Sequence, residues 1–106
     1  MTLRQEGAMV SQHLAELNMG GGDWQQALTD ALELAHKIKG SSGTIGYTMI
    51  SKVAEALEFH LRDLDEEDAY PEEAARERAN SLFSELNALL SDMKPEQSSL
   101  FNRTLA

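Results

Sequence analysis

Apolar residues recur every three to four positions along most of the chain, and this period predicts helices and no strand. The first helix is expected roughly from Thr2 to Asn18, with one apolar stripe formed by Leu3, Val10, Leu14 and Leu17. The glycine run at 20–22 should end it, because glycine has no side chain to pack and loses much backbone entropy on ordering.

The second helix is expected to begin at Asp23, a residue type that favours the N-cap position. Its apolar stripe consists of Leu28, Ala31, Leu32, Ala35 and Ile38. Local rules would end the helix at Gly40, but Ser42 and Ile45 keep the same stripe, so we predict a longer helix that continues through Gly46.

Two further helices follow. The third is expected roughly from Thr48 to Leu64, with a face of Ile50, Val53, Ala54, Leu57, Leu61 and Leu64. Four acids at 65–68 then predict an exposed turn. The fourth is expected to begin near Pro71, which suits the first helical position, and to end at Pro95. Its stripe is Ala75, Ala79, Leu82, Phe83, Leu86, Leu89, Leu90 and Met93.

Short connections between amphipathic helices favour antiparallel neighbours. We therefore predict an all-α fold, an antiparallel up-and-down four-helix bundle over residues 1–95. The C-terminal tail, 96–106, contains apolar residues without a clear period, and either disorder or a short docked cap fits it.

Composition excludes several functions. The chain has 106 residues, enough for one small domain, and 18 acidic against 9 basic side chains give a net charge of −9. Such a charge argues against binding to nucleic acid or to anionic lipid. The chain has no cysteine, no apolar run of membrane-spanning length and no visible signal peptide, so we expect a cytoplasmic protein.

Candidate chemistry is concentrated in residues 35–46. On a helix whose stripe faces the core, His36 points roughly 130° away from that stripe. Its face is shared by Leu32, Lys39, Gly40 and Gly43. A glycine inside a helix costs roughly 0.5–1 kcal/mol relative to alanine. Two beside one exposed histidine suggest that a bulky partner must approach the ring closely.

An imidazole is a competent nucleophile near neutral pH, and Lys39 supplies a cation one turn away, where a phosphoryl group on His36 would place its oxygens. The segment 35–46 contains two lysines and no acid. We therefore expect the surface around His36 to be neutral to basic.

The pattern His36-x-x-Lys39-Gly40-Ser41-Ser42-x-x-x-Gly46 resembles the phosphorylation motif of histidine-containing phosphotransfer (Hpt) domains of two-component phosphorelays. The resemblance implies a four-helix bundle whose histidine accepts a phosphoryl group, at Nε2, from a receiver-domain aspartate and passes it to another receiver. It implies that Lys39 assists the phosphate electrostatically, that Gly40 and Gly43 give access, and that the two serines are small packing residues.

The resemblance also points to Glu58 on the third helix, as a hydrogen-bond acceptor for Nδ1 that fixes the tautomer of His36. A plain surface acid is the alternative for this residue. Lys39 likewise has the alternative of a solvated surface charge.

The implied partners are receiver domains and a hybrid sensor kinase. No intrinsic cofactor or metal is expected, and Mg²⁺ belongs to the receiver. No nucleotide-binding loop or kinase signature is visible, so we expect a phosphotransfer protein, and a monomer, without kinase activity of its own. The starting Met1 favours a freestanding protein over an excised domain.

Two rival functions remain open. Glu33-x-x-His36 matches an element of di-metal carboxylate bundles, but neither His13 nor His60 has a glutamate three residues before it, and these two histidines are read as ordinary. The other rival is a non-phosphorylated bundle that regulates receivers or kinases by binding them.

Overall fold

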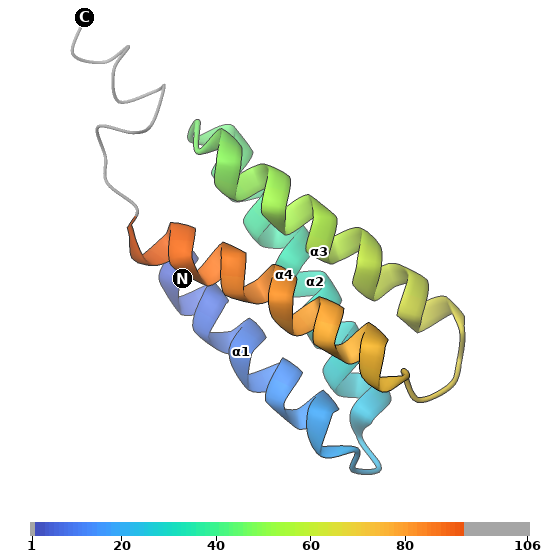
Figure 1. The fold of residues 1–106 in the computed structure, drawn as a ribbon. Helices are drawn as coiled ribbons and strands as arrows, with labels where there is room; N and C mark the ends of the chain where they lie inside the picture. The colour runs from blue at the N-terminus through green and yellow to red at the C-terminus, as the bar shows by residue number, and fades with distance from the viewer. Residues whose placement is uncertain (1, 93–106) are drawn as a thin grey trace, which may run out of the picture.

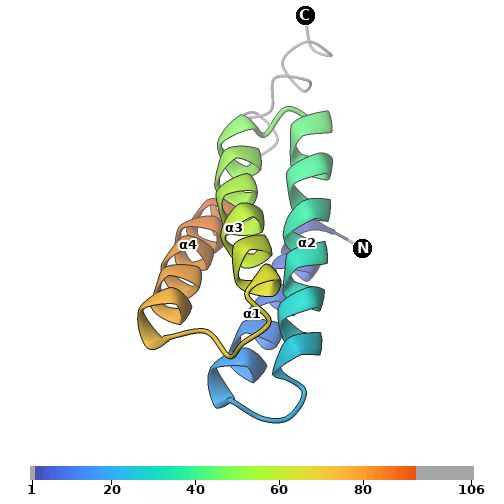
Figure 2. The ribbon, with the colours of Figure 1, turned by 90° about the vertical axis from the view of Figure 1, so that its right-hand side faces the viewer.

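Four α-helices make up the computed structural model, which describes residues 2–92. They are α1 (Leu3–Met19), α2 (Trp24–Thr44), α3 (Thr48–Glu66) and α4 (Glu73–Ser91). The helices run alternately up and down (Figures 1 and 2), and each packs against two neighbours: α1 and α3 both lie between α2 and α4. The predicted all-α, up-and-down four-helix bundle is confirmed.

The predicted apolar stripes form the core. Val10, Ile38, Leu57 and Leu86, one from each helix, are completely buried. Val53, Ala75, Phe83 and Leu89 are partly buried against them. Within residues 2–92, no helix is both long and apolar enough to cross a membrane.

The first helix begins at Leu3 rather than Thr2, because Thr2 is its N-cap. Its hydroxyl accepts a hydrogen bond from the backbone N–H of Gln5 at 3.1 Å, and the Gln5 side chain accepts one from the N–H of Thr2 at 2.8 Å. The helix ends before Gly20, whose φ of 70° lies in the left-handed region that glycine tolerates.

The second helix runs through Gly40 and Gly43, as the longer prediction required, but it ends at Thr44 and not at Gly46. Gly46 has a φ of 88°, and the backbone N–H of Tyr47 donates to the carbonyl of Ser42 at 2.7 Å. This hydrogen bond closes the helix end in a Schellman motif. Ile45, predicted to continue the apolar stripe, therefore lies outside the helix and is exposed.

The connection between α3 and α4 differs from the prediction. The third helix continues to Glu66, so only part of the acidic segment 65–68 is a turn. The fourth begins at Glu73, not at Pro71, because Glu72 is still extended (ψ 158°) and is the N-cap. Pro71 is buried, and its carbonyl accepts a hydrogen bond from Arg76 Nε at 3.2 Å.

The predicted end at Pro95, Met93 and the tail 96–106 lie outside the described residues, and the domain boundary at 95 stays a prediction.

At the end of the bundle where α2 begins, the rings of Trp24 and Tyr70 meet edge to face with centroids 5.6 Å apart. The Tyr70 hydroxyl donates to the carbonyl of Leu17 at 2.8 Å. These contacts fasten the α3–α4 connection to the first two helices.

Candidate functional site

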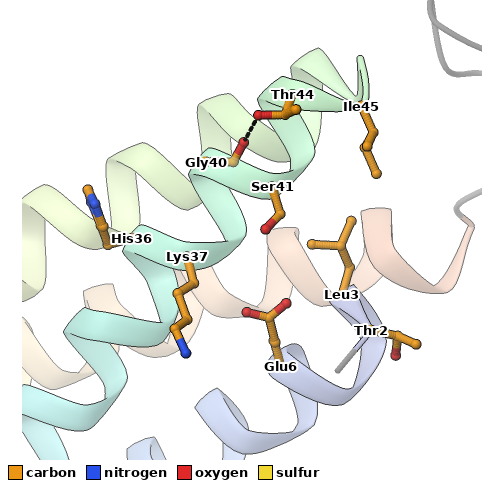
Figure 3. Close-up of a pocket in the computed structure, with 9 residues that line it drawn as sticks. All are labelled: Thr2, Leu3, Glu6, His36, Lys37, Gly40, Ser41, Thr44 and Ile45. Carbon is orange, nitrogen blue, oxygen red and sulfur yellow. Dashed lines mark hydrogen bonds between the residues drawn. The ribbon is translucent and has the colours of Figure 1, made fainter.

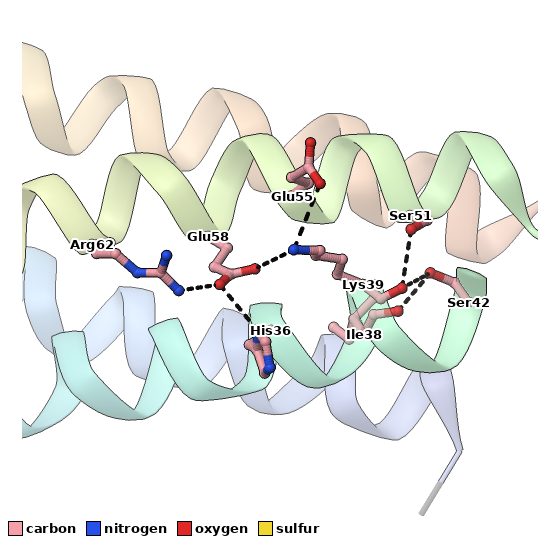
Figure 4. Close-up of polar contacts among 8 residues, drawn as sticks. All are labelled: His36, Ile38, Lys39, Ser42, Ser51, Glu55, Glu58 and Arg62. Carbon is pink, nitrogen blue, oxygen red and sulfur yellow. Dashed lines mark hydrogen bonds and ion pairs between the residues drawn. The ribbon is translucent and has the colours of Figure 1, made fainter. Parts of the chain in front are cut away.

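The imidazole of His36 projects from α2 alongside α3 (Figure 4), and 66% of its side chain is exposed. Its Nδ1 lies 3.0 Å from Oε2 of Glu58 on α3. An ionised carboxylate accepts hydrogen bonds but donates none, so Nδ1 carries the proton in this pair. The other ring nitrogen, Nε2, is then left with a free lone pair.

Glu58 is the buried centre of a charged cluster. Only 1% of its side chain is exposed, so the alternative of a plain surface acid is wrong. The guanidinium of Arg62, one turn along α3, donates to the same Oε2 that meets His36. The ammonium of Lys39 lies 3.6 Å from the other oxygen, Oε1. A carboxylate this deeply buried is tolerated because positive or donating groups surround it.

The pKa of Glu58 reflects these neighbours. Burial alone would raise it, because the charged form loses its hydration. The hydrogen bond from His36 and the nearby charges of Lys39, His36 and Arg62 act in the opposite direction and prevail, so the pKa of Glu58 is lowered from its usual 4.5. The carboxylate therefore stays ionised at neutral pH and keeps accepting the Nδ1 proton.

Lys39 is engaged with α3. Its Nζ is 3.6 Å from Oε2 of Glu55, as well as from Glu58, and lies 5.6 Å from the centre of the Phe59 ring. It is 31% exposed and paired, which differs from the alternative of a solvated surface charge. Its predicted role beside a phosphoryl group stays a prediction.

The expectation of a neutral to basic surface around His36 stays a prediction, because α3 also contributes charges to this surface. Residues 35–46 contain no acid, but α3 brings Glu55 and Glu58 against Lys39 and His36. The cluster mixes both signs because Arg62 and Lys39 offset the two acids.

The two glycines of the motif differ. A Cβ on Gly40 would meet nothing within 4 Å, so this position leaves open space beside the ring. A Cβ on Gly43 would lie 3.3 Å from the hydroxyl oxygen of Ser51, so Gly43 lets α2 and α3 approach closely. That hydroxyl donates to the carbonyl of Lys39 at 3.0 Å and ties the helices together. Leu32 is half-buried on the same face.

The two serines also have different surroundings. Ser42 is fully buried, and its hydroxyl donates to the carbonyl of Ile38, which satisfies it within the helix. Ser41 is exposed and lines a pocket of about 700 Å³ on the other side of α2 (Figure 3). This pocket lies between α2 and the start of α1, whereas the Glu58 cluster lies between α2 and α3.

Sequence reasoning did not identify Arg62, Glu55 or Glu6. Arg62 and Glu55 lie four and three residues from Glu58 on one helix, and that spacing was a usable signal. Glu6 is buried on α1, between Leu3 and Val10, which are seven positions apart in the apolar stripe. An acid between two core positions at this spacing was a usable signal too.

The other two histidines, His13 and His60, take part in contacts within and between helices. Nε2 of His60 donates to the carbonyl of Ala75 at 2.8 Å and joins α3 to α4. His13 is mostly buried, with Nδ1 3.8 Å from Glu16. Among residues 2–92, no three histidine or acidic side chains gather closely enough to hold a metal ion, so Glu33 and His36 have no further ligands there.

A family model described as the Hpt domain matches residues 2–95 of the chain. The searches of curated proteins and of solved structures gave no match. The matched range includes all four helices, and with them His36 and the residues around it on α2.

Proposed function

Because the chain belongs to the Hpt domain family, whose members are phosphotransfer modules of two-component phosphorelays and not kinases, we propose that His36 is its phosphoryl acceptor. The observation that carries the proposal is the pairing of an exposed imidazole with a buried carboxylate through Nδ1. This pairing directs Nε2 outward as the nucleophile.

The transfer step needs only groups that the proposal names. The lone pair of Nε2 attacks the phosphorus of a receiver's aspartyl phosphate, and the bond from phosphorus to the aspartate oxygen breaks, with its electrons returning to the carboxylate. The phosphorylated ring keeps its Nδ1 proton and gains a positive charge, which the carboxylate of Glu58 stabilises at 3.0 Å. The reverse step delivers the group to a second receiver.

The surroundings of His36 suit a protein donor. Gly40 leaves the surface open beside the ring, so a receiver's active site can reach Nε2. Lys39 is within one turn and exchanges its contact with Glu55 for the phosphoryl oxygens. Mg²⁺ is supplied by the receiver. We place the domain in the cytoplasm as a monomer, between a hybrid sensor kinase and its response regulators.

The test is a phosphotransfer profile. Each receiver domain from the same cell is phosphorylated, mixed with the protein and Mg²⁺, and the label on the protein is followed. We expect an acid-labile, alkali-stable label that is lost in His36→Gln and kept in the matched control His13→Gln.

Binding of a receiver without any label on His36 from any donor would contradict the proposal. That result would instead favour the alternative, a non-phosphorylated regulator of receivers or kinases.

A further inference from the structure

The pocket on the α1 side of His36 contains a carboxylate that the transfer step does not use. Glu6 is 7% exposed, and Figure 3 shows its carboxylate pointing from α1 towards α2, beneath Ser41 and beside Lys37. No donor in the described part of the chain lies within hydrogen-bond or ion-pair distance of it. Lys37 lines the same pocket but does not pair with it.

The helix dipole does not explain this burial. An acid in the first turn of α1 gains some stabilisation from the positive end of the helix, but an exposed position in that turn, such as that of Gln5, offers the same gain. The side chain of Glu6 is mostly covered, but its carboxylate oxygens are not among the buried polar atoms that lack a partner, so they face the open pocket. A cation that enters the pocket would therefore meet an unpaired negative charge there.

The shape of the pocket favours a long side chain from another protein. The wall contributed by Leu3 and Ile45 is apolar, while Ser41 and Thr44 are polar. Ile45 is 40% exposed. The stem of an arginine or lysine would pack on the apolar wall and its charged end would reach Glu6. The net charge of −9 also favours a basic partner surface.

His36 lines this pocket as well. A protein that covers the imidazole therefore also covers the pocket opening. We propose that the pocket receives a basic side chain, best an arginine, of the receiver that docks on His36, and that this side chain pairs with Glu6. The inference rests on the proposed function. Glu6 is thus a specificity-determining residue of docking, and it takes no part in the chemistry.

The test measures the dissociation constant of the receiver that exchanges phosphoryl groups fastest in the profile described above. Glu6→Gln keeps the shape and removes the charge, and we expect about tenfold weaker binding with a flatter dependence on salt. Its Tm should stay close to that of the wild type, because the Glu6 carboxylate has no hydrogen-bond or ion-pair partner in the described part of the chain. The matched control Glu16→Gln, on the exposed side of the same helix, should bind as the wild type does.

Equal binding by Glu6→Gln and wild type would overturn the inference while leaving the proposed function intact, because the wild type would still be labelled on His36. Lys37→Gln gives a second check. It removes a like charge beside the incoming cation, so binding should be unchanged or tighter. If it weakens binding as much as Glu6→Gln does, Glu6 acts through Lys37 and the inference fails.

Discussion

Nδ1 of His36 and Oε2 of Glu58 lie 3.0 Å apart, yet the imidazole is 66% exposed and the carboxylate 1%. The carboxylate is held in place by its burial and by its contacts with Arg62 and Lys39, and it orients the imidazole. Under the proposed function, this arrangement would hold the nucleophile on a rigid element while leaving Nε2 accessible to a partner protein.

Removing the acceptor at position 58 should slow phosphorylation of His36. Glu58→Leu leaves Nδ1 without a partner, and we expect a loss of roughly 10- to 100-fold in the rate of transfer from a phosphorylated receiver. Glu58→Gln keeps an amide oxygen as acceptor and should lose much less. Nitrogen-15 NMR of the ring checks the cause, because only the leucine variant should lose the predominance of the Nδ1–H tautomer. An unchanged tautomer in a slow leucine variant would contradict the positioning role.

Stability should depend on the protonation of Glu58. Its pKa in the folded protein is lower than the usual 4.5, so the unfolded chain binds the proton first as the pH falls. The free energy of unfolding should therefore decrease as the pH falls below about 4.5. Urea unfolding, followed by far-UV circular dichroism at several pH values, should show a smaller decrease for Glu58→Gln. Parallel curves for the two proteins would contradict the lowered pKa.

Substitutions at Gly40 should affect the stability of the bundle and the rate of phosphoryl transfer independently. Gly40→Ala is expected to stabilise the helix by about 0.5–1 kcal/mol, since a Cβ there meets nothing within 4 Å. Gly40→Arg should fold equally well but cut transfer from a receiver by more than about tenfold, because its side chain fills the space beside the ring. Thermal unfolding and the labelling assay measure the two effects. Full transfer by the arginine variant would refute the access argument.

At Gly7, by contrast with Gly40, replacement by alanine should destabilise the protein. A Cβ at this position on α1 would lie 2.6 Å from Cδ1 of the buried Leu90 on α4, so Gly7→Ala forces the core to shift. We expect a loss of about 1–3 kcal/mol in the free energy of unfolding. A double variant, Gly7→Ala with Leu90→Val, should recover part of it. No recovery would place the cost elsewhere than in this contact.

The helices were predictable because their signal is local: each stripe repeats within its own segment, and even the run of α2 through Gly40 followed from the continuing position of Ser42. The connection before α4 could not be predicted in this way, because Pro71 is placed by packing and by the hydrogen bond that its carbonyl accepts from Arg76. Those contacts depend on elements that local rules do not see.

Only the part of the candidate site that lies on α2 could be predicted from the sequence. The face that His36 shares with Lys39 and Gly40 follows from the pitch of α2. The meeting of Lys39 with Glu55, and the burial of Glu58, depend on how α3 is rotated against α2, which the periodicity of either helix leaves undetermined. For the same reason, Gly43 faces Ser51 more than the open surface beside His36.

The edge-to-face contact of Trp24 with Tyr70 gives the protein a built-in optical reporter. Trp24 is the single tryptophan of the chain and begins α2, about 18 Å along the helix axis from His36. Its fluorescence should follow unfolding of the bundle and remain unchanged when His36 gains or loses a phosphoryl group. Fold integrity and phosphorylation can therefore be followed in one sample without interference.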